Sequence, residues 1–175
     1  MYLAAAVVGA FGAAFCMRST TRRDLRNGFP AFLAATAIGV AIMHLFATRG
    51  GGKSALFDLK QLGFGAGQFL MLLPVCFVME EVAFRGMLDA HVKPVVPGGK
   101  RRWISAAIVS ILWGLWHLPF FKVSDIAPLA IAQLIAVHLL VGVPLSFCWR
   151  SSGSLLLPAA AHALIDAFRN AVGLM

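Results

Sequence analysis

The sequence predicts an all-α protein, a polytopic bundle of about six membrane-spanning helices. Hydrophobic residues make up 60% of the 175 positions and charged residues 13%, whereas soluble domains are about 45–50% apolar and about 25% charged. The mean hydropathy is +0.85. A spanning helix needs about 20 mostly apolar residues, so a chain of this length holds several spans and leaves no room for a separate soluble domain.

Six apolar runs predict helices over roughly 1–17, 30–47, 64–89, 103–118, 127–149 and 154–170. The basic stretch RSTTRRDLRNG is expected to form a loop before Pro30, a residue suited to the first turn of a helix. Pro74 is expected to kink the third helix.

The segment after the second predicted helix, RGGGKS, lacks the full GxxxxGK[ST] pattern and is interpreted as a linker. The following stretch, 56–62, is predicted to lie along the membrane interface. We therefore divide the chain into N-terminal helices and interfacial linker (1–62) and a helical core (63–175), which together form a single domain.

The net charge of +8 does not indicate nucleic acid as a partner, because no basic stripe alternates with aromatic residues. The cations lie at the ends of apolar runs, where they meet lipid headgroups and fix topology. Nine of them fall in the loops on one side of the predicted bundle and five on the other, which favours both termini outside. The lipid bilayer is the expected surrounding. Cys16, Cys76 and Cys148 show no CxxC spacing and are interpreted as small core residues.

Ionisable side chains inside the predicted helices point to a functional site. A charged residue at the centre of a membrane helix costs about 2.5–3.5 kcal/mol by insertion scales, so it normally faces the interior of the bundle. The groups that could form a shared site lie in three of the predicted helices: Glu80, Glu81 and Arg85 in the third; His117 in the fourth; His162 and Asp166 in the sixth.

Helix geometry separates the two adjacent glutamates. Glu81 and Arg85 are four residues apart and within reach of a structural ion pair. Glu80 points about 100° away from Glu81 in an α-helix, which leaves it available as a general base. The alternative is that all three residues form one buried ion network that fixes helix packing.

The histidines support a shared site when they are taken together. His162 and Asp166 lie at i and i+4, so the carboxylate can orient the imidazole or join it in a site. Each histidine alone would more often be a hydrogen-bonded core residue, which is our interpretation of His138. Convergence of Glu80, His117 and His162 from three helices is hard to explain by packing.

Three motifs resemble those of the CPBP family, the CAAX-protease and bacteriocin-processing (Abi-type) intramembrane endopeptidases. EEVAFRG (80–86) is similar to the EExxxR motif, and SILWGLWHLP (110–119) to the FxxxH motif, with Trp113 in the aromatic position. GSLLLPAAAHALID (153–166) is similar to the HxxxN motif, with Asp166 in its last position. The motifs occur in the family's order over about half of the chain.

The resemblance implies an intramembrane peptide hydrolase whose active site lies inside the bundle of the 63–175 core. It implies that Glu80 activates the attacking water with the help of His117, and that His162 with residue 166 stabilises the oxyanion. The family has been described both as metalloproteases and as metal-independent glutamate proteases. Glu80, His117 and His162 match a zinc ligand set, but another base would then be needed.

Asp166 departs from the motif, because an ionised carboxylate cannot donate a hydrogen bond to an oxyanion as an amide can. It must be protonated, orient His162 or bind a metal. The implied partner is a membrane-embedded or lipidated protein or peptide: a prenylated CAAX tail, a bacteriocin-type leader or a C-terminal sorting anchor. The expected location is a prokaryotic cytoplasmic membrane, with the chain as a multi-pass integral protein.

Two other functions remain open. Intramembrane Glu and His residues also build proton or ion carriers, although a relay should string its groups along a path through the bilayer. The chain could also be a non-catalytic relative of the family that binds a partner or confers immunity.

Overall fold

The computed structural model describes residues 2–49, 59–93, 99–121 and 127–174. Within these ranges the chain is helical and contains no strand, which confirms the predicted all-α fold. The elements are α1 (Tyr2–Ser19), α2 (Arg22–Arg49), α3 (Leu59–Cys76), the π-helix η1 (Phe77–Asp89), α4 (Ala90–Val92), α5 (Gly99–Trp116), the 3₁₀ turn η2 (Leu118–Phe120), α6 (Pro128–Ser152) and α7 (Leu156–Ala171).

Four helical stretches in the described part of the chain are long and apolar enough to cross a membrane. They are Arg22–Arg49, Lys60–Val92, Gly99–Phe120 and Pro128–Ser152. The apolar helix Leu3–Ser19 is shorter, and α7 has 16 residues. The chain is therefore an integral membrane protein whose spans differ in length more than the sequence pattern suggested.

The basic stretch 18–28 is helical over most of its length, so the prediction of a loop there was wrong. Thr21 and Asp24 explain why α2 begins so early. The Asp24 carboxylate accepts hydrogen bonds from the Thr21 N–H (2.9 Å) and hydroxyl (2.7 Å), and the Thr21 hydroxyl accepts one from the Asp24 N–H (3.2 Å). This reciprocal arrangement satisfies backbone donors at a helix N-terminus. Pro30 consequently lies inside α2.

The predicted linker RGGGKS lies outside the described residues except for Arg49, the last residue of α2. The predicted interfacial stretch 56–62 lies outside them up to residue 58, and its remainder opens α3. The division at residue 62 stays a prediction.

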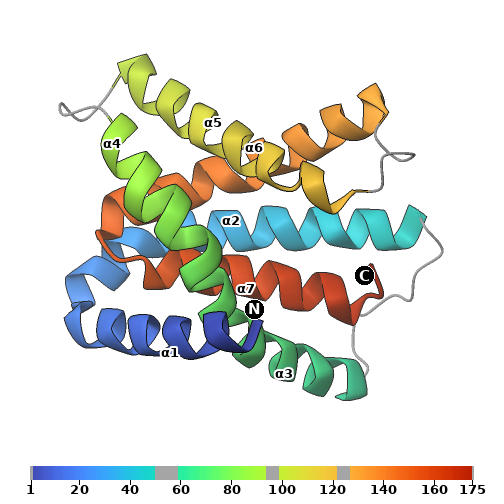
Figure 1. Cartoon of the computed structure of the whole chain (residues 1–175), viewed down its shortest axis with the longest axis horizontal. Coiled ribbons are helices and arrows are strands. Elements are labelled where there is room, and N and C mark those ends of the chain that lie inside the picture. The colour runs from blue at the N-terminus through green and yellow to red at the C-terminus, as the bar shows by residue number, and fades with distance from the viewer. Residues whose placement is uncertain (1, 50–58, 94–98, 122–126, 175) are drawn as a thin grey trace.

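The helices pack so that the two ends of the sequence share one bundle (Figure 1). The N-terminal helix α1 packs on α3 and η1, while α2 packs on α6 and α7, and α3 packs on α7. The contact between α1 and α3 requires glycine at position 9, since a Cβ there would lie 1.8 Å from the Pro74 carbonyl oxygen. Contacts from α2 thus support α6 and α7, and α7 carries His162 and Asp166.

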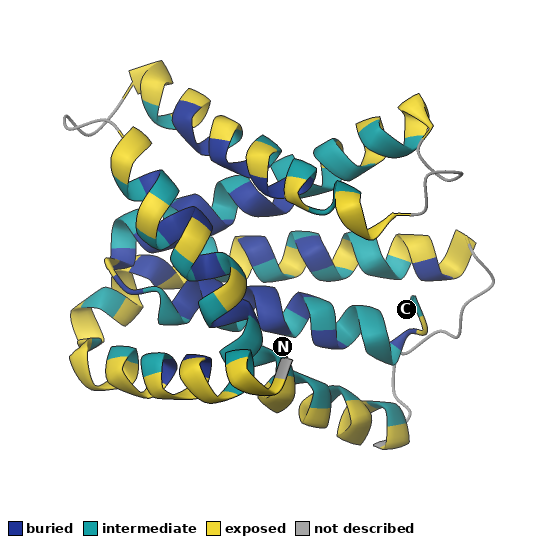
Figure 2. Ribbon diagram, in the orientation of Figure 1, coloured by how far each residue is buried: buried dark blue, intermediate teal, exposed yellow. Residues whose placement is uncertain are grey.

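Many large apolar side chains are exposed while several charged groups are buried, as expected of a protein in lipid. Figure 2 shows the exposed residues along α1 and α3. Phe11 and Phe15 on α1 and Leu70 on α3 are more than 70% exposed. Glu81, Arg85 and other polar residues are buried. The interior therefore carries the ionisable groups that a soluble protein would keep on its surface.

The change from α3 to η1 places the predicted acidic motif on a π-helix. Pro74 cannot donate a backbone hydrogen bond to the carbonyl four residues before it, and the π-helix begins at Phe77. π-helical turns are rare and are frequent at functional sites. Glu80, Glu81 and Arg85 all belong to this segment.

Candidate active site

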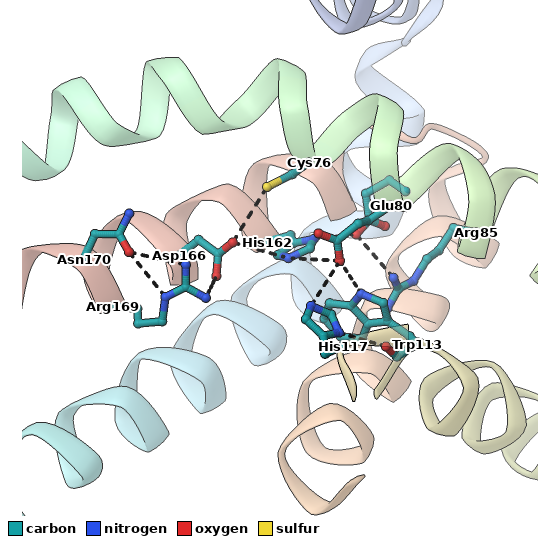
Figure 3. A network of polar contacts seen from close by, with 10 residues as sticks. Cys76, Glu80, Arg85, Trp113, His117, His162, Asp166, Arg169 and Asn170 are labelled. Atoms are coloured by element: carbon teal, nitrogen blue, oxygen red, sulfur yellow. Dashed lines mark hydrogen bonds and ion pairs between the residues drawn. The ribbon is translucent and has the colours of Figure 1, made fainter. Parts of the chain in front are cut away.

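The carboxylate of Glu80 is the meeting point of side chains from three helical stretches (Figure 3). Its Oε2 accepts a hydrogen bond of 2.5 Å from the Trp113 indole N–H. The same oxygen lies 3.7 Å from His117 Nε2 and 3.9 Å from His162 Nε2. The structure therefore brings together the three residues that the sequence selected, and adds Trp113 as a direct partner of Glu80.

Glu81 contacts His162 on the side of the ring that faces away from Glu80. Its Nδ1 lies 2.9 Å from Glu81 Oε1. An ionised carboxylate only accepts hydrogen bonds, so Nδ1 carries the proton. The imidazole, 4% exposed, therefore directs Nε2 toward Glu80.

Glu81 also pairs with Arg85, as the spacing predicts, through Arg85 Nη1 at 3.3 Å. Both side chains are completely buried. The guanidinium group lies over the Trp113 ring, with Cζ 4.4 Å from the ring centroid, a favourable cation–π position. Glu81 is thus not confined to the ion pair with Arg85, because one of its oxygens serves both the arginine and His162.

His117 follows the last residue of α5, in a turn. Its Nδ1 lies 2.9 Å from the Trp113 carbonyl oxygen. A carbonyl can only accept, so Nδ1–H is the donor and Nε2 faces Glu80. Trp113 therefore contacts the site twice, holding Glu80 through its indole and His117 through its backbone.

His138 lies closer to the site than its apolar surroundings in the sequence suggested. It donates Nδ1–H to the Leu134 carbonyl at 2.7 Å, which agrees with the predicted hydrogen-bonded histidine. Its ring also lies 4.5 Å from the Trp113 ring and 4.6 Å from the His117 ring. No charged residue at helical spacing marks this position, so only the packing of α5 against α6 reveals it.

Asp166 does not hold His162 by a hydrogen bond. Its Oδ2 lies 3.7 Å from His162 Nε2, while its Oδ1 pairs with Arg169 Nη1 at 3.0 Å. The second neighbour of Oδ2 is the thiol of Cys76, at 3.9 Å. Glu81, rather than Asp166, orients the imidazole.

One set of side chains in the described part of the chain has the spacing of metal ligands. The ligand atoms of Cys76, His162 and Asp166 all lie within 4.8 Å of one another. This set shares only His162 with the predicted trio of Glu80, His117 and His162. Cys76 was interpreted as a core residue, although it lies four positions before Glu80, one turn of an α-helix away.

A comparison with known protein families identifies the family of the chain. The family model described as type II CAAX prenyl endopeptidase Rce1-like matches residues 61–168, more than half of the chain. The matched range contains every residue labelled in Figure 3 except for Arg169 and Asn170. No curated protein and no solved structure matches the chain.

Proposed function

Because the chain belongs to the type II CAAX prenyl endopeptidase Rce1-like family, we propose that it is an intramembrane endopeptidase that uses Glu80, His117 and His162 to hydrolyse a peptide bond of a membrane-associated or prenylated protein. The observation that supports this most directly is the position of Glu80 Oε2, within 4 Å of both imidazole Nε2 atoms. Amide hydrolysis by water needs a base and a group that stabilises developing negative charge. The two kinds of group stand side by side here.

Glu80 serves as the general base. The attacking water is held between Glu80 Oε2 and His117 Nε2, a separation of 3.7 Å that allows small shifts to place one water against both. Glu80 takes a proton as the oxygen bonds to the scissile carbonyl carbon, and later gives it to the leaving amine. The Trp113 indole fixes the carboxylate in this position through its hydrogen bond to Oε2.

His162 stabilises the oxyanion in its protonated form. An imidazolium donates from both nitrogens, so Nδ1–H remains on Glu81 and Nε2–H is offered to the oxyanion. Glu81 is fully buried and balances the positive charge. The same pair keeps the ring from rotating, so the donor is oriented before the substrate arrives.

A substrate anchored in the membrane fits the surroundings of the site. Glu80 lies in the Lys60–Val92 stretch, which is apolar and long enough to cross a membrane. Its side chain is 18% exposed and that of His117 28%, so a peptide can reach them without unfolding the bundle. A lipidated tail or a membrane-embedded segment is delivered at this depth, whereas a soluble protein is not.

The proposal is tested with purified protein in detergent or liposomes and a prenylated CAAX peptide, together with a search for uncleaved precursors in membranes that carry the variant. Glu80→Gln and His162→Ala are expected to abolish cleavage, because each removes a proton acceptor or donor at the reacting atoms. His91→Ala, an exposed histidine outside the site, serves as the matched control. Full activity of either site variant, with an unchanged melting temperature, would refute the assignment.

A further inference from the structure

Asp166 and Cys76 have no role in the reaction proposed above. Asp166 occupies the motif position where the family has asparagine, and it points one oxygen toward both Cys76 Sγ and His162 Nε2. Cys76 is 3% exposed. We propose that Cys76, His162 and Asp166 bind a zinc ion, and that Glu80 stays outside the ligand set. This inference rests on the proposed function in placing the ion at the same active site, and it revises one role: an ion on His162 Nε2 replaces the proton there, so zinc rather than an imidazolium would face the oxyanion.

Two of the three distances between the donor atoms are close to those that zinc requires. Tetrahedral zinc with Zn–S of about 2.3 Å and Zn–O of about 2.1 Å separates sulfur from oxygen by about 3.6 Å, and nitrogen from oxygen by about 3.4 Å. The corresponding separations are 3.9 Å for Cys76 Sγ to Asp166 Oδ2 and 3.7 Å for His162 Nε2 to Asp166 Oδ2. These two contacts need to shorten by about 0.3 Å, and the Cys76 Sγ to His162 Nε2 separation, which is within 4.8 Å, has to reach about 3.6 Å. Thiolate, imidazole and carboxylate are all donors that zinc accepts.

The groups behind the three ligands are those that support a metal site. His162 donates Nδ1–H to the Glu81 carboxylate at 2.9 Å, which fixes the tautomer whose Nε2 lone pair is free. A carboxylate in that place is the usual outer partner of a zinc-bound histidine. Asp166 is held through its other oxygen by Arg169 at 3.0 Å, so Oδ2 remains available. Two of the three ligands are therefore oriented by charged partners.

The charge balance of the centre is kept when a divalent cation replaces the proton on His162 Nε2. Glu80, Glu81 and Asp166 bring three carboxylates, against the two guanidinium groups of Arg85 and Arg169 that pair with them. A His162 imidazolium supplies the third positive charge of the metal-free site. When His162 is neutral, as zinc at Nε2 requires, one negative charge remains, and an uncompensated charge is costly away from water. Zinc together with a Cys76 thiolate adds one positive charge and makes the centre neutral. The thiol proton leaves to solvent when the ion binds.

This ligand set resolves the difficulty posed by zinc at Glu80, His117 and His162, where the base itself would become a ligand. With Cys76 and Asp166 as ligands instead, Glu80 Oε2 lies 3.9 Å from His162 Nε2, next to the ion but free to accept a proton. Bound zinc would supply a Lewis acid that polarises the scissile carbonyl. The side chains of Glu80 and Asp166, 18% and 19% exposed, leave a path for the ion to enter.

The proposal is tested by metal binding, independently of cleavage. Protein purified in detergent is stripped with a chelator, titrated with Co²⁺ and examined for the near-ultraviolet absorption of a thiolate–cobalt bond, and zinc content is measured after reloading. One zinc per chain and a thiolate band are expected for the wild-type protein. Cys76→Ala is expected to lose the band, and Asp166→Asn to keep it with weaker binding. Glu81→Gln is expected to bind about 10- to 100-fold more weakly, as other outer partners of zinc ligands do.

Two control variants make the result specific. Cys148→Ala removes another buried thiol, which donates to the Gly28 carbonyl at 3.6 Å, and should leave the band and the zinc content unchanged. Glu80→Gln and His117→Ala should also retain zinc. Loss of binding in those two variants, with retention in Cys76→Ala, would overturn the proposal in favour of the Glu80, His117 and His162 set. An absent thiolate band in the wild-type protein would overturn it as well.

The metal-binding and cleavage experiments can give different results, so the failure of one proposal can be told from the failure of the other. Stoichiometric zinc on Cys76 with no cleavage of any precursor would leave the metal site standing and remove the proposed function. Cleavage that persists in Cys76→Ala and in chelator-treated protein would leave the glutamate-dependent hydrolase standing and show that the ion has no part in it.

Discussion

Replacing Trp113 with phenylalanine tests how much the reaction depends on the position of Glu80. The family's FxxxH motif has phenylalanine at the place of Trp113, so the variant restores that aromatic residue and removes only the indole N–H and part of the ring. The lost hydrogen bond is the 2.5 Å contact to Glu80 Oε2. Hydrogen bonds to charged groups contribute about 1.5–3 kcal/mol.

If the Trp113–Glu80 hydrogen bond mainly aligns the carboxylate with the attacking water, removing it should slow the chemical step. Taking about 1.4 kcal/mol per factor of ten, kcat should fall by about 10- to 150-fold, and KM should change little because Trp113 is 3% exposed and does not face the substrate. Cleavage of a prenylated CAAX peptide by the purified variant measures both constants. The melting temperature measured in parallel separates a loss of position from a loss of folding.

Trp103→Phe provides the control, since this tryptophan is 62% exposed and contacts Phe147 rather than the site. It should leave kcat and KM unchanged. A kcat for Trp113→Phe within twofold of the wild-type value, in a folded protein, would show that the indole does not hold the base and would remove Trp113 from the proposed mechanism.

Three further predictions concern the scaffold. Arg150→Ala should lower the free energy of unfolding by about 3–5 kcal/mol, because it leaves the fully buried Asp89 carboxylate without its arginine; chemical denaturation in detergent measures this, and a change below 1 kcal/mol would contradict it. Gly9→Ala should lower the melting temperature by pushing α1 away from the Pro74 carbonyl, with an unaltered melting curve as the contrary result. His138→Phe should keep kcat within a few-fold, since it preserves the ring contact with Trp113; abolished cleavage by folded protein would instead make His138 part of the chemistry.

The fold class could be predicted from composition and apolar runs, because the absence of water around the spans forces backbone groups into helices. The start of α2 could not be predicted by hydropathy. Its first turn is polar and basic, and the hydrogen bonds between Thr21 and Asp24 that begin it lie in a stretch that counts as a loop on any hydropathy scale. The sequence does contain the signal, a threonine followed three residues later by an acidic residue.

The site could be predicted in its main members because charge inside an apolar helix is conspicuous. Cys76 and Trp113 carry no charge, so nothing in composition distinguishes them from other core residues. Their importance arises from tertiary contacts: α3 packs on α7 and brings Cys76 to Asp166, and the indole of Trp113 extends from α5 to Glu80. Motif spacing within one helix cannot report a contact between two.

The two adjacent glutamates of η1 share one histidine, which the spacing of the motif did not predict. With about 100° between neighbours in an α-helix, the sequence pattern assigned Glu81 to Arg85 and left Glu80 for the shared site. In the π-helix η1 both glutamates lie near His162, one at each ring nitrogen. Glu81 thereby fixes the imidazole while Glu80 stays beside its free nitrogen. Two adjacent carboxylates acquire different roles through their neighbours: Glu81 is fully buried against Arg85, whereas Glu80 is partly exposed and lies between two imidazoles.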